Sequence, residues 1–91
     1  MARVRILKVV SEDPWLTEPL WESEDLGQFE VFEKFDKILE KYMKEGWRCF
    51  DYGSASYQLC VRGREKVLIY IKFSESELDL SQDPILGVLL H

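Results

Sequence analysis

The sequence predicts one α+β domain in which a long helix packs on a mixed four-stranded sheet, with the elements in the order β-α-β-β-β. Apolar residues recur every three or four positions between residues 29 and 43, which is the period of an amphipathic helix. After Gly46 apolar and polar residues alternate, which is typical of strands. The chain of 91 residues is long enough for one hydrophobic core and too short for two domains, so we treat residues 1–91 as a single unit.

The first strand is expected over residues 3–10, where RVRILKVV is rich in β-branched residues. Residues 11–26 are expected to form a long acidic loop, because two prolines interrupt regular structure there. Loops of this length are usually functional or partly disordered. The loop carries Trp15 and Trp21, which we expect to pin it onto the domain; the alternative is that both tryptophans contact a partner.

The helix is expected to begin near Ser23, which is a suitable N-cap, and to end at Gly46. Three Glu–Lys pairs with the acid four positions before the base support it, each by about 0.2 to 0.5 kcal/mol. The apolar stripe of this helix comprises Phe29, Phe32, Phe35, Ile38, Leu39, Tyr42 and Met43.

Three further strands are expected over residues 47–52, 57–62 and 66–73, joined as an antiparallel meander. Residues 78–91 form a C-terminal segment, in which Asp83 and Pro84 favour the start of a short helix.

The stretch CFDYGSASYQLC predicts a hairpin whose two strands match residue for residue. A turn centred on Ser54 and Ala55 places Cys49 opposite Cys60 and Tyr52 opposite Tyr57. The next turn, at residues 62–65, places Leu59 opposite Leu68. The register assigns every side chain of the meander to one of two faces.

Three states are open for Cys49 and Cys60. Cytosolic thiols are normally reduced, so two buried free thiols are favoured over a structural disulfide. A redox or metal role is the third alternative, although no histidine or further cysteine is available nearby to complete a zinc site.

One face of the meander is apolar enough to receive the helix, and the other is aromatic. The aromatic face carries Phe50, Tyr52, Tyr57, Leu59, Leu68 and Tyr70, bordered by Arg48, Lys66 and Lys72. A face without a covering helix is usually polar, so we expect this one to be covered or used for binding. The candidates are the C-terminal segment or the tryptophan loop, a second copy of the chain, and a different ligand.

The helix and meander over residues 29–73, with Lys72 ending the last strand, are similar in outline to the core of restriction-endonuclease-like nucleases. That resemblance implies a carboxylate two positions before the lysine and a second acid on the preceding strand, holding a divalent metal. Tyr70 and Gln58 occupy those places. The likeness is therefore one of topology, without the catalytic residues.

No catalytic constellation is visible in the sequence, and we expect neither a cofactor nor a metal. The single histidine, His91, is the last residue. The expected function is that of a small non-enzymatic interaction protein, associating with itself or another protein through the aromatic face or the C-terminal segment. The alternative is a nucleic-acid accessory protein using a basic patch, although the net charge of −5 opposes general phosphate binding. That patch would comprise Arg48, Arg62, Arg64, Lys66 and Lys72.

The expected location is the cytoplasm, with no membrane association, because neither a signal peptide nor a long apolar span is visible. The abundance of Glu, Lys and aromatic residues is compatible with a thermophilic source.

Overall fold

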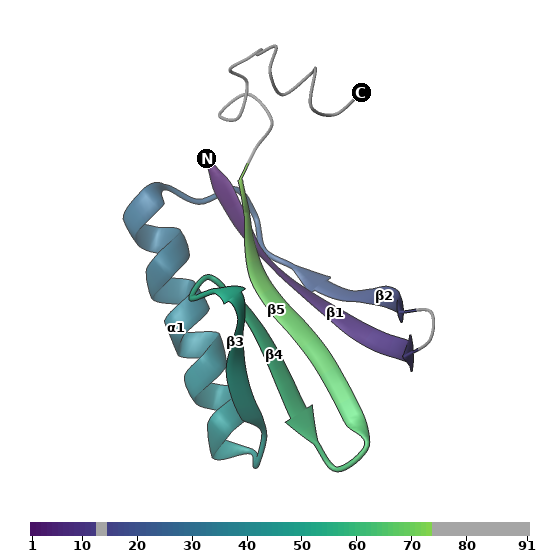
Figure 1. Ribbon diagram of the computed structural model, residues 1–91. Coiled ribbons are helices and arrows are strands. Elements are labelled where there is room, and N and C mark those ends of the chain that lie inside the picture. Colours follow the sequence, from purple (N-terminus) through teal and green to yellow (C-terminus); the bar gives the residue numbers. More distant parts are fainter. Residues whose placement is uncertain (13–14, 74–91) are drawn as a thin grey trace.

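The computed structural model describes residues 1–12 and 15–73. Within them the chain forms one helix and five strands (Figure 1). The helix α1 covers one face of the single sheet, whose strand order is β2-β1-β5-β4-β3 and whose neighbouring strands are all antiparallel. The elements are β1 (Ala2–Glu12), β2 (Trp15–Glu22), α1 (Gln28–Lys44), β3 (Arg48–Ser54), β4 (Tyr57–Arg62) and β5 (Glu65–Phe73).

The expected mixed four-stranded sheet is wrong, because residues 15–22 form a strand instead of a loop. β2 runs back beside β1, and this additional reversal inverts the direction of every later element. The last strand, β5, therefore lies antiparallel to β1 rather than parallel to it. The overall α+β class holds, with five antiparallel strands and one helix among the described residues.

β2 tolerates a proline because it lies at the edge of the sheet. It has a hydrogen-bonding neighbour on one side only, and Pro19 pairs with Leu7 directly after a break in the register. A proline lacks the N–H that a central strand would need, so edges and bulges are where strands accept it. Two of the acidic residues that made this segment resemble a loop, Glu18 and Glu22, are exposed on this edge strand.

The N-cap of α1 is Gly27, four residues after the N-cap expected at Ser23. Ser23 is instead buried, and its hydroxyl accepts a hydrogen bond from the Val4 N–H (3.0 Å) and donates one to the Glu24 carbonyl (2.9 Å). The chain continues beside β1 as far as Leu26, which bridges to Ala2. Gly27 then precedes the helix, with its N–H bonded to the Glu30 carboxylate at 2.9 Å.

The core lies between α1 and the sheet. Val31 and Phe35 are the buried helix residues, whereas Phe29 is 87% exposed. Residues two apart on a helix are separated by about 200°, so burying Val31 turns Phe29 to solvent. Phe32 and Met43 of the expected stripe are also exposed. The sheet side of the core comprises Ala2, Val4, Ile6, Trp47, Cys60, Val67, Ile69 and Ile71.

The meander follows the expected register except at its first turn. The pairing of Cys49 with Cys60 and of Leu59 with Leu68 is confirmed. The direct pairing of Tyr52 with Tyr57 is wrong, because the register shifts between Asp51 and Ser54, and Ser54 takes the place opposite Tyr57. Gly53 adopts a φ of +94° within this irregular stretch, a conformation that favours glycine.

The C-terminal segment, residues 78–91, with the short helix expected in it, lies outside the described residues.

Candidate functional site

The candidate site is the face of the sheet opposite α1, which we call the helix-free face. Alternation along β3, β4 and β5 places the aromatic side chains of the meander there, as the register predicted. β1 extends the face, because Arg5 pairs with Tyr70 and Leu7 pairs with Leu68. Two rows of side chains cross the face from strand to strand.

The first row is apolar and consists of Phe50, Leu59, Leu68 and Leu7, on β3, β4, β5 and β1. Burial falls from the centre of this row toward the β3 edge. Leu68 on the central strand is only 4% exposed, Leu59 is partly buried, and Phe50 is 53% exposed. The side chain at the edge has a neighbour on one side only, so the row ends in an uncovered phenylalanine.

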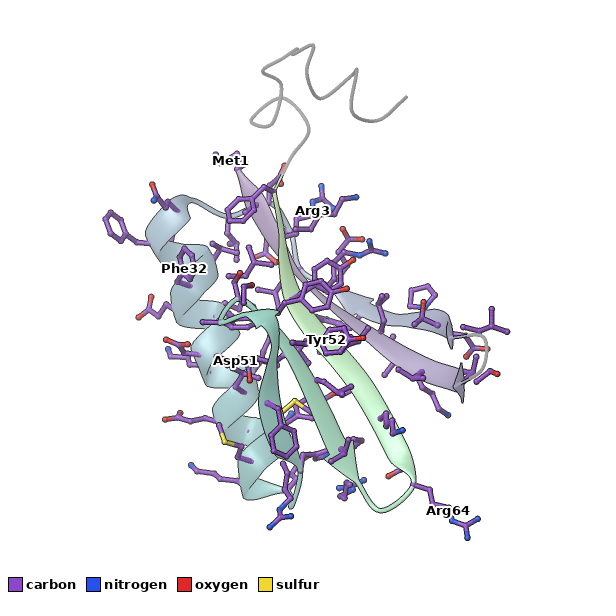
Figure 2. The ribbon with its side chains drawn as sticks, viewed as in Figure 1. Met1, Arg3, Phe32, Asp51, Tyr52 and Arg64 are labelled. Atoms are coloured by element: carbon purple, nitrogen blue, oxygen red, sulfur yellow. A yellow bond between two sulfur atoms is a disulfide. The ribbon has the colours of Figure 1, made fainter. Side chains whose placement is uncertain are left out.

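The second row is a tyrosine ladder formed by Tyr52, Tyr57 and Tyr70. The rings of Tyr57 and Tyr70 are stacked, with centroids 4.6 Å apart and planes inclined by 16°. The ring centroids of Tyr52 and Tyr57 are 6.0 Å apart, and Tyr52 is 49% exposed. Figure 2 labels Tyr52. The rings therefore cover one another's faces, and the exposed end of the ladder is at β3.

Arg5 joins the other end of the tyrosine ladder to β2. Its guanidinium donates a hydrogen bond to the Tyr70 hydroxyl (2.9 Å) and lies 5.8 Å from the Tyr70 ring centroid. Its Nε lies 4.0 Å from the Glu22 carboxylate and is buried without a hydrogen-bond partner. A chain of contacts thus runs from Tyr52 on β3 to Glu22 on β2.

This packing perturbs the titration of Tyr57. Burial raises the pKa of the Tyr57 hydroxyl above its ordinary value of 10.0, and the neighbouring Tyr70 and Tyr52 raise it further. The positive charge of Arg5 acts in the opposite direction and lowers this pKa. The packing of the ladder therefore favours the protonated form of the Tyr57 hydroxyl.

Cations border the helix-free face, although the net charge of the chain is −5. Arg48, Lys66 and Lys72 lie on this face, as the strand alternation predicted. Arg3 pairs with Lys72 across the strands and forms ion pairs with Asp25 (3.2 Å) and Glu22 (3.6 Å).

Arg62, at the β4–β5 turn, is held away from the other cations of the expected basic patch. Arg62 lies over the Trp47 ring at 4.6 Å, donates a hydrogen bond to the Glu45 carbonyl and pairs with Glu65 at 3.2 Å. Trp47 belongs to the core on the helix side, so Arg62 is bound away from the tyrosines. Arg64 projects from the tip of the hairpin (Figure 2).

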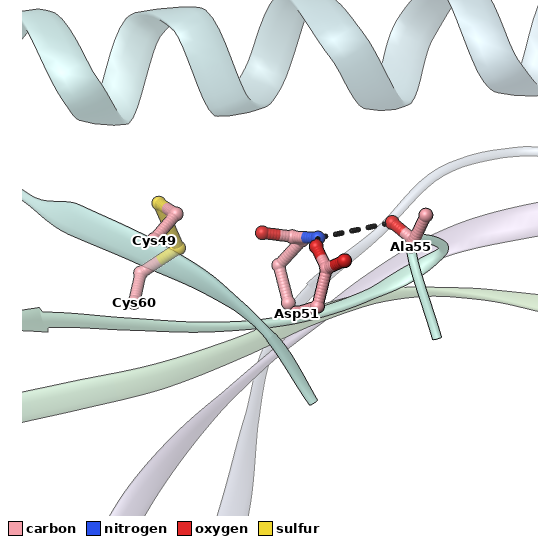
Figure 3. The surroundings of a disulfide bond; sticks show 5 residues. Cys49, Asp51, Ala55 and Cys60 are labelled. Carbon is pink, nitrogen blue, oxygen red and sulfur yellow. Dashed lines mark hydrogen bonds between the residues drawn. A yellow bond between two sulfur atoms is a disulfide. The ribbon is translucent and has the colours of Figure 1, made fainter. Parts of the chain in front are cut away.

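A disulfide joins Cys49 to Cys60, whereas the sequence favoured two free thiols. The two Cα atoms are 4.0 Å apart, on directly opposed residues. Near it the Gln58 amide donates hydrogen bonds to the Asp51 carboxylate and to the Ala55 carbonyl. Both groups lie on the side of the sheet that faces α1 (Figure 3), and both fasten the edge strand β3 to the rest of the hairpin.

Trp21, from the expected loop, does not lie on the helix-free face. Trp21 lines a groove of about 470 Å³ between β2 and α1, with Leu20, Ile6 and Ile38. The Lys34 ammonium lies 5.9 Å from the Trp21 ring centroid. Trp15 is in β2, and its side chain is outside the described part of the structure.

The sequence did not place Arg3, Arg5 and Leu7 on this face, because it could not show that β1 lies beside β5. Arg3 and Arg5, two positions apart in β1, were the available signal, since alternate residues of a strand lie on the same face.

Residues 1–12 and 15–73 contain no group of three or more His, Cys, Asp or Glu side chains able to hold a metal ion. Within the same residues no helix is long and apolar enough to cross a membrane. Comparisons with protein-family models, with curated proteins and with solved structures gave no significant match.

Proposed function

We propose that this chain is a non-enzymatic interaction protein that associates with itself through the β3 side of its helix-free face. One observation carries the proposal: the apolar row and the tyrosine ladder both end at β3 in half-exposed aromatic side chains, Phe50 and Tyr52. Exposed aromatic residues that continue a buried row are typical of protein interfaces.

The charge on the helix-free face argues against stacking two whole faces on one another. Two copies in that arrangement would bring Arg48, Lys66 and Lys72 of one copy toward the same cations of the other. Like charges in contact cost free energy unless acids intervene. A contact restricted to the β3 side buries the exposed rings and keeps most of these cations in solvent.

Single-stranded nucleic acid is the weaker candidate for this face. Cations beside aromatic rings suit a single strand when its bases can stack on the ring faces. Here Tyr57 and Tyr70 are stacked on each other, and Arg62 is bound on the helix side. Oligonucleotide binding that weakens steeply with salt would favour this candidate over self-association.

Light scattering after gel filtration, across a range of concentrations, tests the proposal. We expect Phe50→Lys to weaken association, because it removes the exposed apolar ring and places a charge in the contact. Burying the exposed half of Phe50 is worth about 1 to 1.5 kcal/mol per copy. A symmetric pair loses twice that, so the dissociation constant should rise by about 30- to 140-fold.

Phe29→Lys is the matched control, because Phe29 is 87% exposed at the start of α1 and should not affect the contact. A wild-type chain that stays monomeric at high concentration contradicts the proposal. Equal effects of the two substitutions contradict the assigned surface.

A further inference from the structure

The two edges of the sheet differ in how they are protected. β2, at one edge, contains Pro19 and two breaks in its register with β1, devices that discourage another strand from pairing there. β3, at the other edge, has no proline or lysine and only one register break, between Asp51 and Ser54, and its residues are exposed from Phe50 onward. No strand among the described residues pairs with its outer side.

The backbone groups that β3 presents at this edge can be identified from the hydrogen-bond pattern of the hairpins. The Ile71 N–H donates to the Ser56 carbonyl at 3.1 Å, so the opposed residues Tyr57 and Tyr70 form a non-hydrogen-bonded pair. Alternate residues of β4, Tyr57 and Leu59 among them, therefore direct their backbone groups toward β3.

Phe50 is opposite Leu59, so its backbone groups bond to β4. The Cα atoms of Cys49 and Cys60 are 4.0 Å apart. The shorter Cα separation in an antiparallel sheet is that of a non-hydrogen-bonded pair, so this distance agrees with the pattern. The N–H and carbonyl groups of Cys49 and Asp51 consequently point outward, away from β4.

From this geometry we infer that β3 pairs antiparallel with β3 of a second copy, with Phe50 on the two-fold axis. The inference rests on the proposed self-association and specifies its geometry. An isologous antiparallel pair has its axis perpendicular to the sheet, so the central residue lies opposite itself. Cys49, Phe50 and Asp51 are the three possible centres within the regular part of the strand.

Two of these centres are unfavourable. A centre at Asp51 would place two carboxylates directly opposite each other, which destabilises a strand pair. A centre at Cys49 would require the Trp47 N–H, which already donates to the Tyr42 carbonyl at 3.1 Å. A centre at Phe50 places Cys49 of each copy opposite Asp51 of the other. The N–H and carbonyl groups of both residues then all have hydrogen-bond partners in the second copy.

This register continues the features of the helix-free face across the junction. The apolar row runs through Phe50 into Phe50 and Leu59 of the second copy, and Arg48 lies opposite Tyr52 of the second copy. On the other face, Met43 is 51% exposed on the flank of α1 away from Lys41, which lines the groove beside β2. The assembled sheet has β2 at both outer edges, where it is protected.

Amide hydrogen exchange measured by NMR at low and high protein concentration tests the inference. We expect association to slow exchange of the Cys49 and Asp51 amides by at least tenfold. The amides of Leu16 and Thr17, on the opposite edge strand, should change little and provide the control.

Association with unchanged exchange at Cys49 and Asp51 overturns the edge pairing and leaves the proposed function standing. A monomer at every concentration overturns both. Equally slow exchange of these two amides at a concentration where light scattering shows a monomer also overturns the pairing, because the chain would then cover its own edge.

Discussion

Reducing the disulfide between Cys49 and Cys60 is expected to lower the free energy of unfolding by about 3 kcal/mol. The two cysteines are 11 positions apart, so the bond closes a small loop in the unfolded chain. The loss of chain entropy for a loop of about 12 residues corresponds to about 3 kcal/mol at 25 °C. Domains of this size have a total stability of about 5 to 15 kcal/mol, so the change is a large share of it.

Urea unfolding with and without a phosphine reductant measures the difference. For a small domain with an m-value of about 1 to 1.5 kcal/mol per molar urea, the midpoint should fall by about 2 to 3 M. Protein concentration must be the same in both series, because self-association itself adds stability. The Cys49→Ala/Cys60→Ala double variant is the control, and the reductant should leave its midpoint unchanged.

A midpoint shift below about 0.5 M on complete reduction would refute this reasoning. It would mean that residues 49–60 stay in a hairpin after the rest of the chain has unfolded. The bond would then remove little entropy from the unfolded state.

The remaining predictions concern single side chains. Because folding raises the pKa of Tyr57, the unfolded chain loses this proton at a lower pH than the folded chain does. The contribution of Tyr57 to the free energy of unfolding is therefore full below pH 10 and is lost as the pH rises through the folded-state pKa. Arg5→Met should move the ultraviolet titration of Tyr57 to higher pH, because Arg5 lowers this pKa; an unchanged or lower titration midpoint would contradict it. Ser23→Ala should cost about 1 to 3 kcal/mol in thermal or urea unfolding, because it leaves the buried Val4 N–H without an acceptor. Ser54→Ala, at an exposed site, should cost less than about 0.5 kcal/mol, and equal losses would count against the role of Ser23.

The parts of the fold that sequence reasoning predicted correctly are those specified by local periodicity. The three meander strands and the pairing of Cys49 with Cys60 follow from alternation and turn positions, which are short-range signals. The existence of α1 follows from its apolar spacing, but its start does not. Ser23 has the chemistry of an N-cap, and the same hydroxyl serves equally well to bond the Val4 N–H across the chain.

The errors arise where position within the sheet overrides residue type. Pro19 and its acidic neighbours are typical of a loop, yet an edge strand needs hydrogen bonds on one side only and accepts them. The contribution of Arg5 to the tyrosine ladder depends on which strand lies beside β5, and no local pattern specifies that long-range pairing. Because the reversal of the chain at β2 was not predicted, the expected sheet was mixed, whereas the observed sheet is antiparallel throughout.

The disulfide and the free edge belong to the same strand, and this bears on how strongly two copies can pair. An unrestrained edge strand must lose conformational entropy before it can accept another strand, at about 1 to 2 kcal/mol per residue of backbone. Cys49 is covalently joined to β4, and Asp51 is hydrogen-bonded to Gln58, so the two residues with outward backbone groups are ordered within one chain. Pairing then requires little further ordering of β3, and more of the hydrogen-bond and aromatic contact energy is left to hold the two copies together.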